Sequence, residues 1–324
     1  MGQEKETSGN QGNSAKKPTQ VTQKGWKEIG KRVSNQLTVD HITIVSAGVA
    51  YYFFLALFPA LIAAISIYGL VMDPAQVEQQ MNQLTGILPE QAAQMMSGIL
   101  QSVAGQTEQA LGWGLVISLL FSLWSAQQGT SAVFEGVNIA YNEIDERGMI
   151  KQKAIVLLFT LVGILTGIIC TVLVVVFPAL VGTLNLPSIL QTLIEWLRWP
   201  LLALLIIVGL GLVYKIAPDR DNPQFQWVSV GAVIATVLWL VGSVLFSLYI
   251  DNFGNYGETY GSFAAVIILM LWFFLTAYII LLGAEINSEM EHQTYADTTV
   301  GEDKPMGERG GYHADHVAGN KIDP

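Results

Sequence analysis

The sequence predicts an all-α integral membrane protein, a polytopic bundle of six transmembrane helices with both termini in the cytoplasm. Three observations support this fold class. Of the 324 residues, 52% are hydrophobic and only 13% are charged, whereas soluble domains carry roughly a quarter charged residues. The mean hydropathy is +0.44. The apolar residues gather in six long segments, and the Lys and Arg residues are spread unevenly over the connections between them.

The six segments each reach the roughly 20 apolar residues that a membrane-spanning helix requires. Together they form a predicted transmembrane domain over residues 41–290. Pro59 lies inside the first segment and predicts a kink there. The six predicted spans cover residues 42–72, 111–133, 154–182, 199–217, 227–250 and 263–284.

Two polar segments flank this domain. Residues 1–40 are rich in Gly, Gln, Ser, Thr and Lys and predict a disordered basic cytoplasmic tail, and residues 291–324 predict a disordered acidic cytoplasmic tail. The first apolar run starts too late and is too long for a signal peptide. His313, Asp315 and His316 have a spacing that permits loose metal binding, but such tails usually bind nothing specific. We therefore predict no metal and no cofactor.

The distribution of basic residues predicts the orientation. With six spans, fifteen of the sixteen Lys and Arg residues lie on one side of the membrane, in the two tails and in the second and fourth connections. No Lys or Arg occurs between Arg32 and Arg147, and only Arg198 falls on the other side. Cytoplasmic connections carry an excess of basic residues. Both termini of this multi-pass protein are therefore predicted to be cytoplasmic.

The first outer connection carries helix signals of its own. Asp73 and Pro74 read as an N-cap followed by proline at the first helical position, and Pro89 with Glu90 opens a second stretch of the same kind. Apolar residues at helical spacing follow each start. We predict two short amphipathic helices on the outer side, lying at the membrane surface or packed as a compact cap on the bundle.

Polar residues recur within and beyond the second span. They follow one another at intervals of three or four residues, which places them on one stripe of a helix. The stripe either lines a hydrophilic path, or bonds to neighbouring helices, or simply protrudes, because the helix is longer than the hydrocarbon layer is thick. Its members are Trp124, Gln128, Ser131, Glu135, Asn138 and Asn142.

Further polar groups lie at the cytoplasmic ends of other spans, notably Asp40 and His41, Tyr214 and Lys215, and Glu285 with Asn287. With Glu135 they predict an inner vestibule, although polar caps at helix ends are also ordinary. The residues that we predict to line a cavity are Trp124, Gln128, Ser131, Glu135, Asn138, Glu285 and Asn287.

Small residues predict close contacts between helices. Gly163 and Gly167 lie one turn apart in the third span, and Gly231 with Ala235 do so in the fifth. Such pairs are common by chance in glycine-rich spans. They therefore indicate a compact bundle and leave the oligomeric state open.

Several short motifs together resemble the YihY/BrkB family of bacterial inner-membrane proteins, members of which have also carried the name ribonuclease BN. The resemblance covers about residues 25–290, and its most specific part is the sixth span with Gly283, Glu285 and Asn287. The chain departs from the family pattern in two places. The tyrosine that the pattern has after Trp272 is replaced here, where Phe273 follows, and Glu135 is not a residue expected in the family. The motif residues are Tyr51, Tyr52, Pro59, Pro218, Tyr256, Tyr260, Gly261, Trp272 and Gly283.

The resemblance implies a six-span inner-membrane protein associated with envelope integrity, resistance to serum killing and export of lipids or solutes. The ribonuclease reading is rejected on the residues, because a metal-dependent nuclease needs clustered histidines and carboxylates in a water-exposed domain. The formal charge of −10 excludes nucleic acid as a partner. The chain lacks a P-loop motif and any nucleophile–base pair at a recognisable spacing, so no enzyme is predicted.

Two functional hypotheses remain. The first is a transporter or flippase-like permease for an envelope component or amphiphilic solute, with the lipid bilayer and a lipid or small solute as its partners. The alternative is a non-transporting membrane scaffold that supports envelope integrity.

Overall fold

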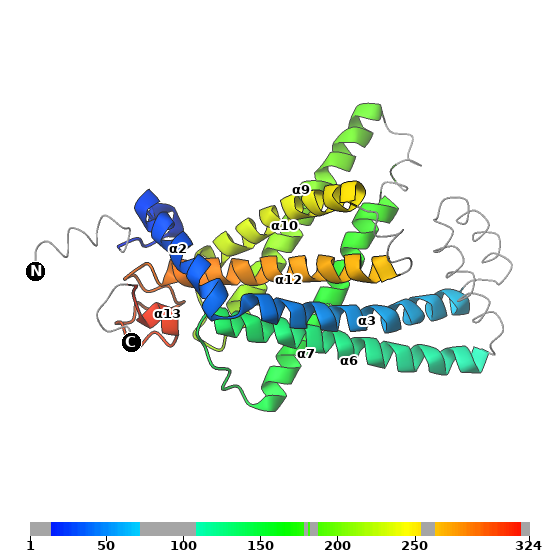
Figure 1. Ribbon diagram of the computed structural model, residues 1–324, viewed down its shortest axis with the longest axis horizontal. Coiled ribbons are helices and arrows are strands. Elements are labelled where there is room, and N and C mark those ends of the chain that lie inside the picture. Colours follow the sequence, from blue (N-terminus) through cyan, green and yellow to red (C-terminus); the bar gives the residue numbers. More distant parts are fainter. Residues whose placement is uncertain (1–13, 72–107, 178–180, 182–186, 254–262, 319–324) are drawn as a thin grey trace, which may run out of the picture. The chain divides into compact units, whose positions relative to one another are not determined.

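The structure is a computed structural model that describes residues 14–71, 108–177, 181, 187–253 and 263–318. This part of the chain is helical, as predicted, with one isolated β-bridge between Pro223 and Thr299 and no strand. A 3₁₀ turn covers Pro18–Gln20, and a π-helical turn, Val172–Val176, directly follows the α-helix Met149–Thr171. The α-helices are α2 (Gln23–Val39), α3 (Ile42–Val71), α6 (Glu108–Ala140), α7 (Met149–Thr171), α9 (Ser188–Ile216), α10 (Phe225–Phe253), α12 (Phe263–Glu291) and α13 (Tyr312–Asp315) (Figure 1).

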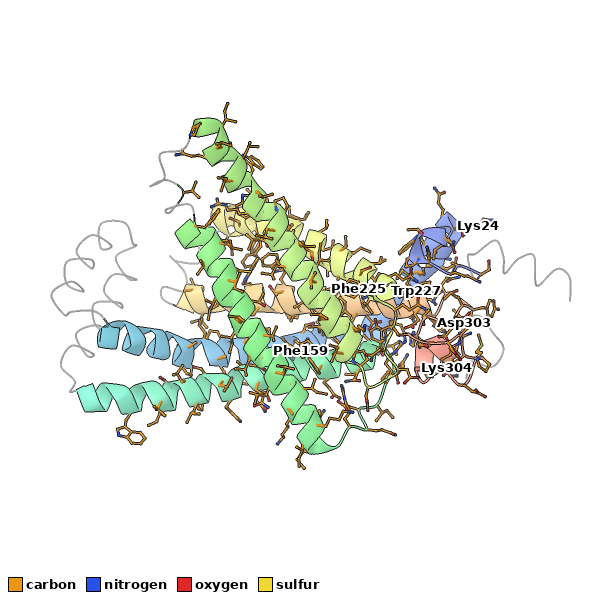
Figure 2. All side chains as sticks on the ribbon, turned by 180° about the vertical axis from the view of Figure 1, so that it is seen from behind. Lys24, Phe159, Phe225, Trp227, Asp303 and Lys304 are labelled. Atoms are coloured by element: carbon orange, nitrogen blue, oxygen red, sulfur yellow. The ribbon has the colours of Figure 1, made fainter. Side chains whose placement is uncertain are left out.

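Five helices are long and apolar enough to cross a membrane. Large apolar side chains are exposed along them, with many on α7, α9 and α10, as expected of surfaces that face lipid tails rather than water; Figure 2 draws the side chains on these helices. Helix α6 is long as well, but it is not one of these five segments. Six spans therefore remain a prediction. The five segments are Ile42–Ala60, Met149–Val174, Ile189–Ile216, Phe225–Ile250 and Ala264–Glu291.

Parts of the predicted architecture lie outside the described residues. The two outer amphipathic helices were predicted within residues 73–108, almost all of which are not described. The same holds for the motif residues Tyr256, Tyr260 and Gly261. The cytoplasmic placement of both termini also remains a prediction.

The helices divide between two compact units. The smaller unit comprises residues 50–129 and 250–273. Within it, the backbone carbonyl of Tyr52 accepts a hydrogen bond from Ser125 Oγ at 3.5 Å. The rings of Phe53 and Phe273 meet edge to face, with centroids 6.1 Å apart. Gly129 makes room for the Phe53 ring, since a Cβ there would lie 2.6 Å from it.

In the larger unit, α10 and α12 approach closely. A Cβ on Gly231 would collide with the backbone oxygen of Gly283 and lie 2.6 Å from the Asn287 amide. Asn287 fixes this crossing, because its Oδ1 accepts from Gly231 N at 2.7 Å and its Nδ2 donates to Val228 O at 2.9 Å. Small residues therefore bring these two backbones together, as the sequence predicted for Gly231.

The glycines of α7 behave differently. A Cβ on Gly163 or Gly167 would meet nothing within 4 Å, and both residues are exposed. The predicted helix approach at this pair is therefore wrong for the described chain. The spacing of small residues allows a contact, but a neighbouring helix has to be present for one to form.

The prediction of a disordered N-terminal tail is also wrong from residue 14 onward. Thr22 caps α2 by accepting a hydrogen bond from Gly25 N at 3.2 Å. Val21, Ile29 and Val33 bury one face of this segment in a core with Trp227 and Met290. Apolar residues at intervals of four form one helical stripe, and a polar average over forty residues concealed that stripe.

The C-terminal tail is folded as far as residue 318. Arg309 is buried, and its guanidinium donates to the backbone oxygens of Tyr295, Ala296 and Ala314. Thr294 Oγ1 donates to Ala15 O at 2.5 Å, which joins the two terminal segments. The segment's own side chains thus satisfy its backbone, which disordered polar tails cannot do. The disorder predicted for residues 291–324 is therefore wrong over residues 291–318.

Candidate functional site

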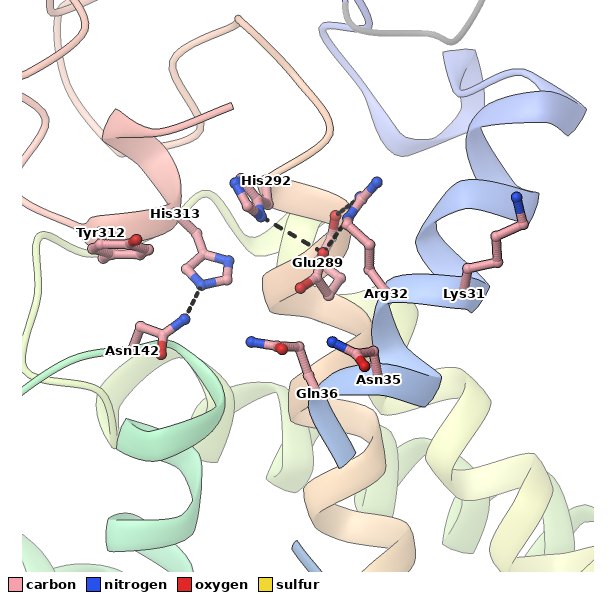
Figure 3. Close-up of a pocket in the computed structure, with 9 residues that line it drawn as sticks. All are labelled: Lys31, Arg32, Asn35, Gln36, Asn142, Glu289, His292, Tyr312 and His313. Carbon is pink, nitrogen blue, oxygen red and sulfur yellow. Dashed lines mark hydrogen bonds and ion pairs between the residues drawn. The ribbon is translucent and has the colours of Figure 1, made fainter. Parts of the chain in front are cut away.

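Polar side chains gather in the larger unit where α2, the end of α6 and the end of α12 meet the C-terminal segment (Figures 1 and 3). A cavity of about 400 Å³ opens among them. It is lined by Lys31, Arg32, Asn35, Gln36, Asn142, Glu289, His292, Tyr312 and His313.

One wall of the cavity is an ion pair between α2 and α12. Arg32 Nε lies 2.5 Å from Glu289 Oε2, and Arg32 Nη2 donates to the Glu289 backbone oxygen at 2.9 Å. His292 Nδ1 lies 3.6 Å from the same carboxylate oxygen. The Glu289 side chain is only 3% exposed, so this pair is shielded from water and salt more than a surface pair would be.

The opposite wall is the C-terminal end of α6. Glu143 N donates to Asn138 O and Asn142 N donates to Ile139 O, both at 2.9 Å, which is the Schellman arrangement. Asn142 has a φ of 54°, and asparagine tolerates this left-handed conformation better than most residues. The cap turns the Asn142 side chain toward His313 (Figure 3).

His313 is held as a neutral imidazole by its two neighbours. Its Nδ1 lies 3.0 Å from the backbone oxygen of Ser288 and must donate there. Its Nε2 lies 2.9 Å from Asn142 Nδ2 and therefore accepts. Burial, with a smaller contribution from nearby His292, lowers the pKa of His313 to about 4.

This environment predicts a specific loss of stability in acid. Between about pH 6.5 and 4 the unfolded chain binds a proton at His313 that the folded chain does not. The stabilising contribution is thus complete above pH 6.5 and falls by about 1.4 kcal/mol per pH unit as the pH drops toward 4. We expect thermal unfolding in detergent, followed by tryptophan fluorescence, to show a flatter acid limb for His313→Gln than for the wild type. His316→Gln is the matched control, because His316 caps the C-terminus of the same short helix but is only partly buried. Equal acid limbs in all three proteins would contradict the assignment.

A buried ion pair anchors the C-terminal segment beside the cavity. The Arg220 side chain is fully buried, and its Nη1 and Nη2 lie 2.5 and 2.7 Å from the two Glu291 carboxylate oxygens. Thr298 donates its hydroxyl to the same carboxylate. The guanidinium also lies over the Tyr141 ring, 5.5 Å from its centroid. The connection between α9 and α10 is thereby tied to α12 and to the tail.

Two carboxyl groups face each other one helical turn from the cavity. Glu285 on α12 is completely buried, and neither of its side-chain oxygens has a hydrogen-bond donor in the described structure. Asp40, directly after α2, has its carboxyl within hydrogen-bonding reach of Glu285, and its buried Oδ2 also lacks a donor. Burial raises the pKa of Asp40 above its usual value. His41 follows with a φ of 50° and turns the chain from α2 into α3.

The stripe predicted on α6 does not act as one surface. Trp124 and Glu135 are exposed, whereas Gln128 and Ser131 are partly buried. Asn138 is buried and bonds to backbone: its Nδ2 donates to Phe134 O at 3.0 Å, and its Oδ1 accepts from Asp219 N at 3.0 Å. Asn138 thus makes the structural hydrogen bonds that were one alternative to cavity lining for the stripe, and Asn287 bonds to the backbone of α10.

None of the seven residues predicted to line a cavity lines the cavity described above. Glu285 comes nearest to it in sequence, one turn before Glu289 on α12. Their lining of another cavity remains a prediction. The sequence analysis missed Arg32 and Glu289, which lay in a segment assigned to a tail and at the end of a span, and it considered His313 only for loose metal binding in a disordered tail. A usable signal was present on α12, since Glu285, Glu289 and His292 follow at helical spacing.

The exposed apolar helices and the polar cluster at one end define a multi-pass helical membrane protein. A family model described as Virulence factor BrkB matches residues 33–307. The chain therefore belongs to the BrkB family, which confirms the resemblance seen in the sequence.

Curated relatives agree with this membership. YfkH, a ribonuclease-like protein of Bacillus subtilis (strain 168), is 30% identical over 264 residues, covering 80% of this chain and 93% of that protein. A UPF0761 membrane protein of Vibrio parahaemolyticus is 25% identical over 276 residues, 82% of each chain. A UPF0761 membrane protein of Idiomarina loihiensis is 39% identical over 80 residues, 25% of this chain and 28% of that protein. No solved structure matches the chain.

Proposed function

We propose that this protein is an inner-membrane permease that moves an amphiphilic envelope component of the phospholipid class across the bilayer. In this proposal six helices span the membrane, both termini are cytoplasmic, and the cavity between α2, α6 and α12 opens toward the cytoplasm. The lipid bilayer is both its surroundings and the source of its substrate.

One observation carries the proposal. Glu285 lies where the apolar part of α12, a helix long enough to span the membrane, meets its polar end, and it is completely buried with no hydrogen-bond donor in the described structure. Burying an ionisable group in such a helix is costly, and residues of this kind usually mark substrate or ion pathways. The polar cavity one turn away supplies the water-accessible end that such a pathway needs.

A scaffold function is the second candidate, and the folded extramembrane segments favour it. Helix α2 and residues 292–318 form a structured region anchored by the Arg220–Glu291 pair, which offers a surface to a partner protein. A scaffold has no need of a buried carboxyl pair without donors. We carry over no RNA cleavage from the name of YfkH.

A lipid-movement assay tests the proposal. The full chain is reconstituted into liposomes that contain a phospholipid labelled with a fluorescent headgroup, and dithionite then quenches the label in the outer leaflet. We expect the protein to expose inner-leaflet label that stays protected in protein-free liposomes, and Glu285→Gln to slow this exposure about tenfold. Glu302→Gln, an exposed acidic residue beyond α12, should match the wild type.

The outcomes separate the two candidate functions. Label protection equal to that of protein-free liposomes would contradict the permease proposal and favour the scaffold. Equal rates for wild type and Glu285→Gln, with both proteins folded, would remove Glu285 from the pathway.

A further inference from the structure

The carboxyl groups of Asp40 and Glu285 interact with each other and lack a hydrogen-bond donor in the described structure. Both oxygens of Glu285 and Oδ2 of Asp40 are buried without a donor, yet the two carboxyls are within hydrogen-bonding reach of each other. Two ionised carboxylates that lie this close repel each other. No hydrogen bond can join them, because neither carries a proton.

The neighbouring charges add more repulsion than they relieve. Glu289, one turn along α12, adds negative charge at both groups, and His41 is the basic group that acts on Asp40. Arg32 is paired with Glu289, and Arg220 is paired with Glu291. A proton is the simplest occupant that turns the repulsion into a hydrogen bond, because it gives one carboxyl the donor that the pair lacks.

We propose that Asp40 and Glu285 form a proton-binding site that holds one shared proton. The pair takes one proton from water, so that one carboxylic acid donates a hydrogen bond to the other carboxylate and the pair carries a single negative charge. Carboxyl pairs in such contact share a proton because both cannot be ionised at once.

The cavity offers this site a route to water. Gln36 precedes Asp40 by one turn of α2, and the Asp40 backbone N donates to Gln36 O at 2.8 Å. Glu289 follows Glu285 by one turn of α12. Both Gln36 and Glu289 line the cavity, so each carboxyl of the pair lies one helical turn below a cavity-lining side chain.

The inference deepens the proposed function and rests on it in one respect: in a permease, the shared proton would couple lipid movement to the proton gradient. Proton binding itself requires no transport. It can therefore be tested on the purified protein without any assumption about a substrate.

Infrared spectroscopy of the full chain in lipid nanodiscs is the direct test, because a protonated carboxyl has a carbonyl band that a carboxylate lacks and that shifts in heavy water. We expect this band at neutral pH in the wild type. We expect its complete loss in Asp40→Asn and also in Glu285→Gln. Each amide donates a hydrogen bond to the carboxylate that remains, so neither single variant needs a proton.

The matched control is Glu143→Gln. Glu143 is another partly buried carboxyl at this end, but its Oε1 accepts a hydrogen bond from Tyr312 N at 2.7 Å, so it has a donor and needs no shared proton. This variant should keep the band. Circular dichroism of each variant verifies that the helices are retained.

The possible results separate the shared-proton site from the permease proposal. A band absent from the wild type, retained in Asp40→Asn, or lost in Glu143→Gln would overturn the shared-proton site. A band that behaves as expected in a protein that moves no lipid would leave the proton site standing and contradict the permease. Lipid movement in a protein without the band would contradict the proton site and leave the permease proposal standing.

Discussion

Replacing Arg220 with methionine should lower the free energy of unfolding by about 3 to 5 kcal/mol, because the substitution leaves the buried Glu291 carboxylate without its cation. Both side chains of this pair are almost fully shielded from solvent, so water cannot take the place of the guanidinium. Thr298 alone would then remain as a side-chain donor to the carboxylate. Thermal or denaturant unfolding in detergent, followed by tryptophan fluorescence, measures the change.

The double variant Arg220→Met/Glu291→Leu provides the control. Replacing both members of a buried ion pair with apolar residues of similar volume is often neutral or stabilising, so we expect it to recover most of the loss. If Arg220→Met alone proved as stable as the wild type, the pair would not hold the C-terminal segment in place.

Among substitutions that add one methyl group to a described residue, we expect Gly231→Ala to destabilise the protein most. Its Cβ would collide with the backbone oxygen of Gly283, which cannot rotate away as a flexible side chain can. It would also disturb the Asn287 amide, which bonds to both Gly231 N and Val228 O. We expect a loss of about 3 kcal/mol or more in the free energy of unfolding, at the upper end of overpacking costs. The yield of monodisperse protein after extraction and the unfolding midpoint both report it.

Gly163→Ala is the matched control in another apolar helix. Its new methyl group would meet nothing within 4 Å, and alanine favours the helix over glycine by about 1 kcal/mol. We expect this variant to be as stable as the wild type or slightly more so. Similar losses in the two variants would show that helix approach at Gly231 is not the cause.

The residues that these predictions expect to matter, Arg220, Glu291 and Gly231, all lie in the larger unit. The same region holds the cavity, the neutral His313 and the facing carboxyls. By contrast, many large apolar side chains of α7, α9 and α10 are exposed. This contrast is what we expect of a protein whose long helices face lipid while its chemistry is concentrated at a polar end.

The sequence alone determined the membrane-protein class, the apolar helices and the family. Those conclusions depend on local properties: a span needs about 20 consecutive apolar residues because the hydrocarbon layer has a fixed thickness, and backbone groups in lipid must bond within their own helix. Composition and short motifs carry that information without knowledge of which segments meet. The number of spans beyond five and the orientation remain predictions from the same local signals.

Only the tertiary structure decided what the polar residues do. Arg32 and Glu289 are 257 positions apart, and Ala15 and Thr294 are 279 apart, so no local pattern shows that they meet. Asn138 resembled a cavity residue by spacing, but it bonds to the backbone of the α9–α10 connection. Both tails resembled disordered segments by average polarity, but each folds because its few apolar and charged side chains find partners at the end of α12. The burial of a polar group, and hence its protonation and its role, is a property of such distant contacts.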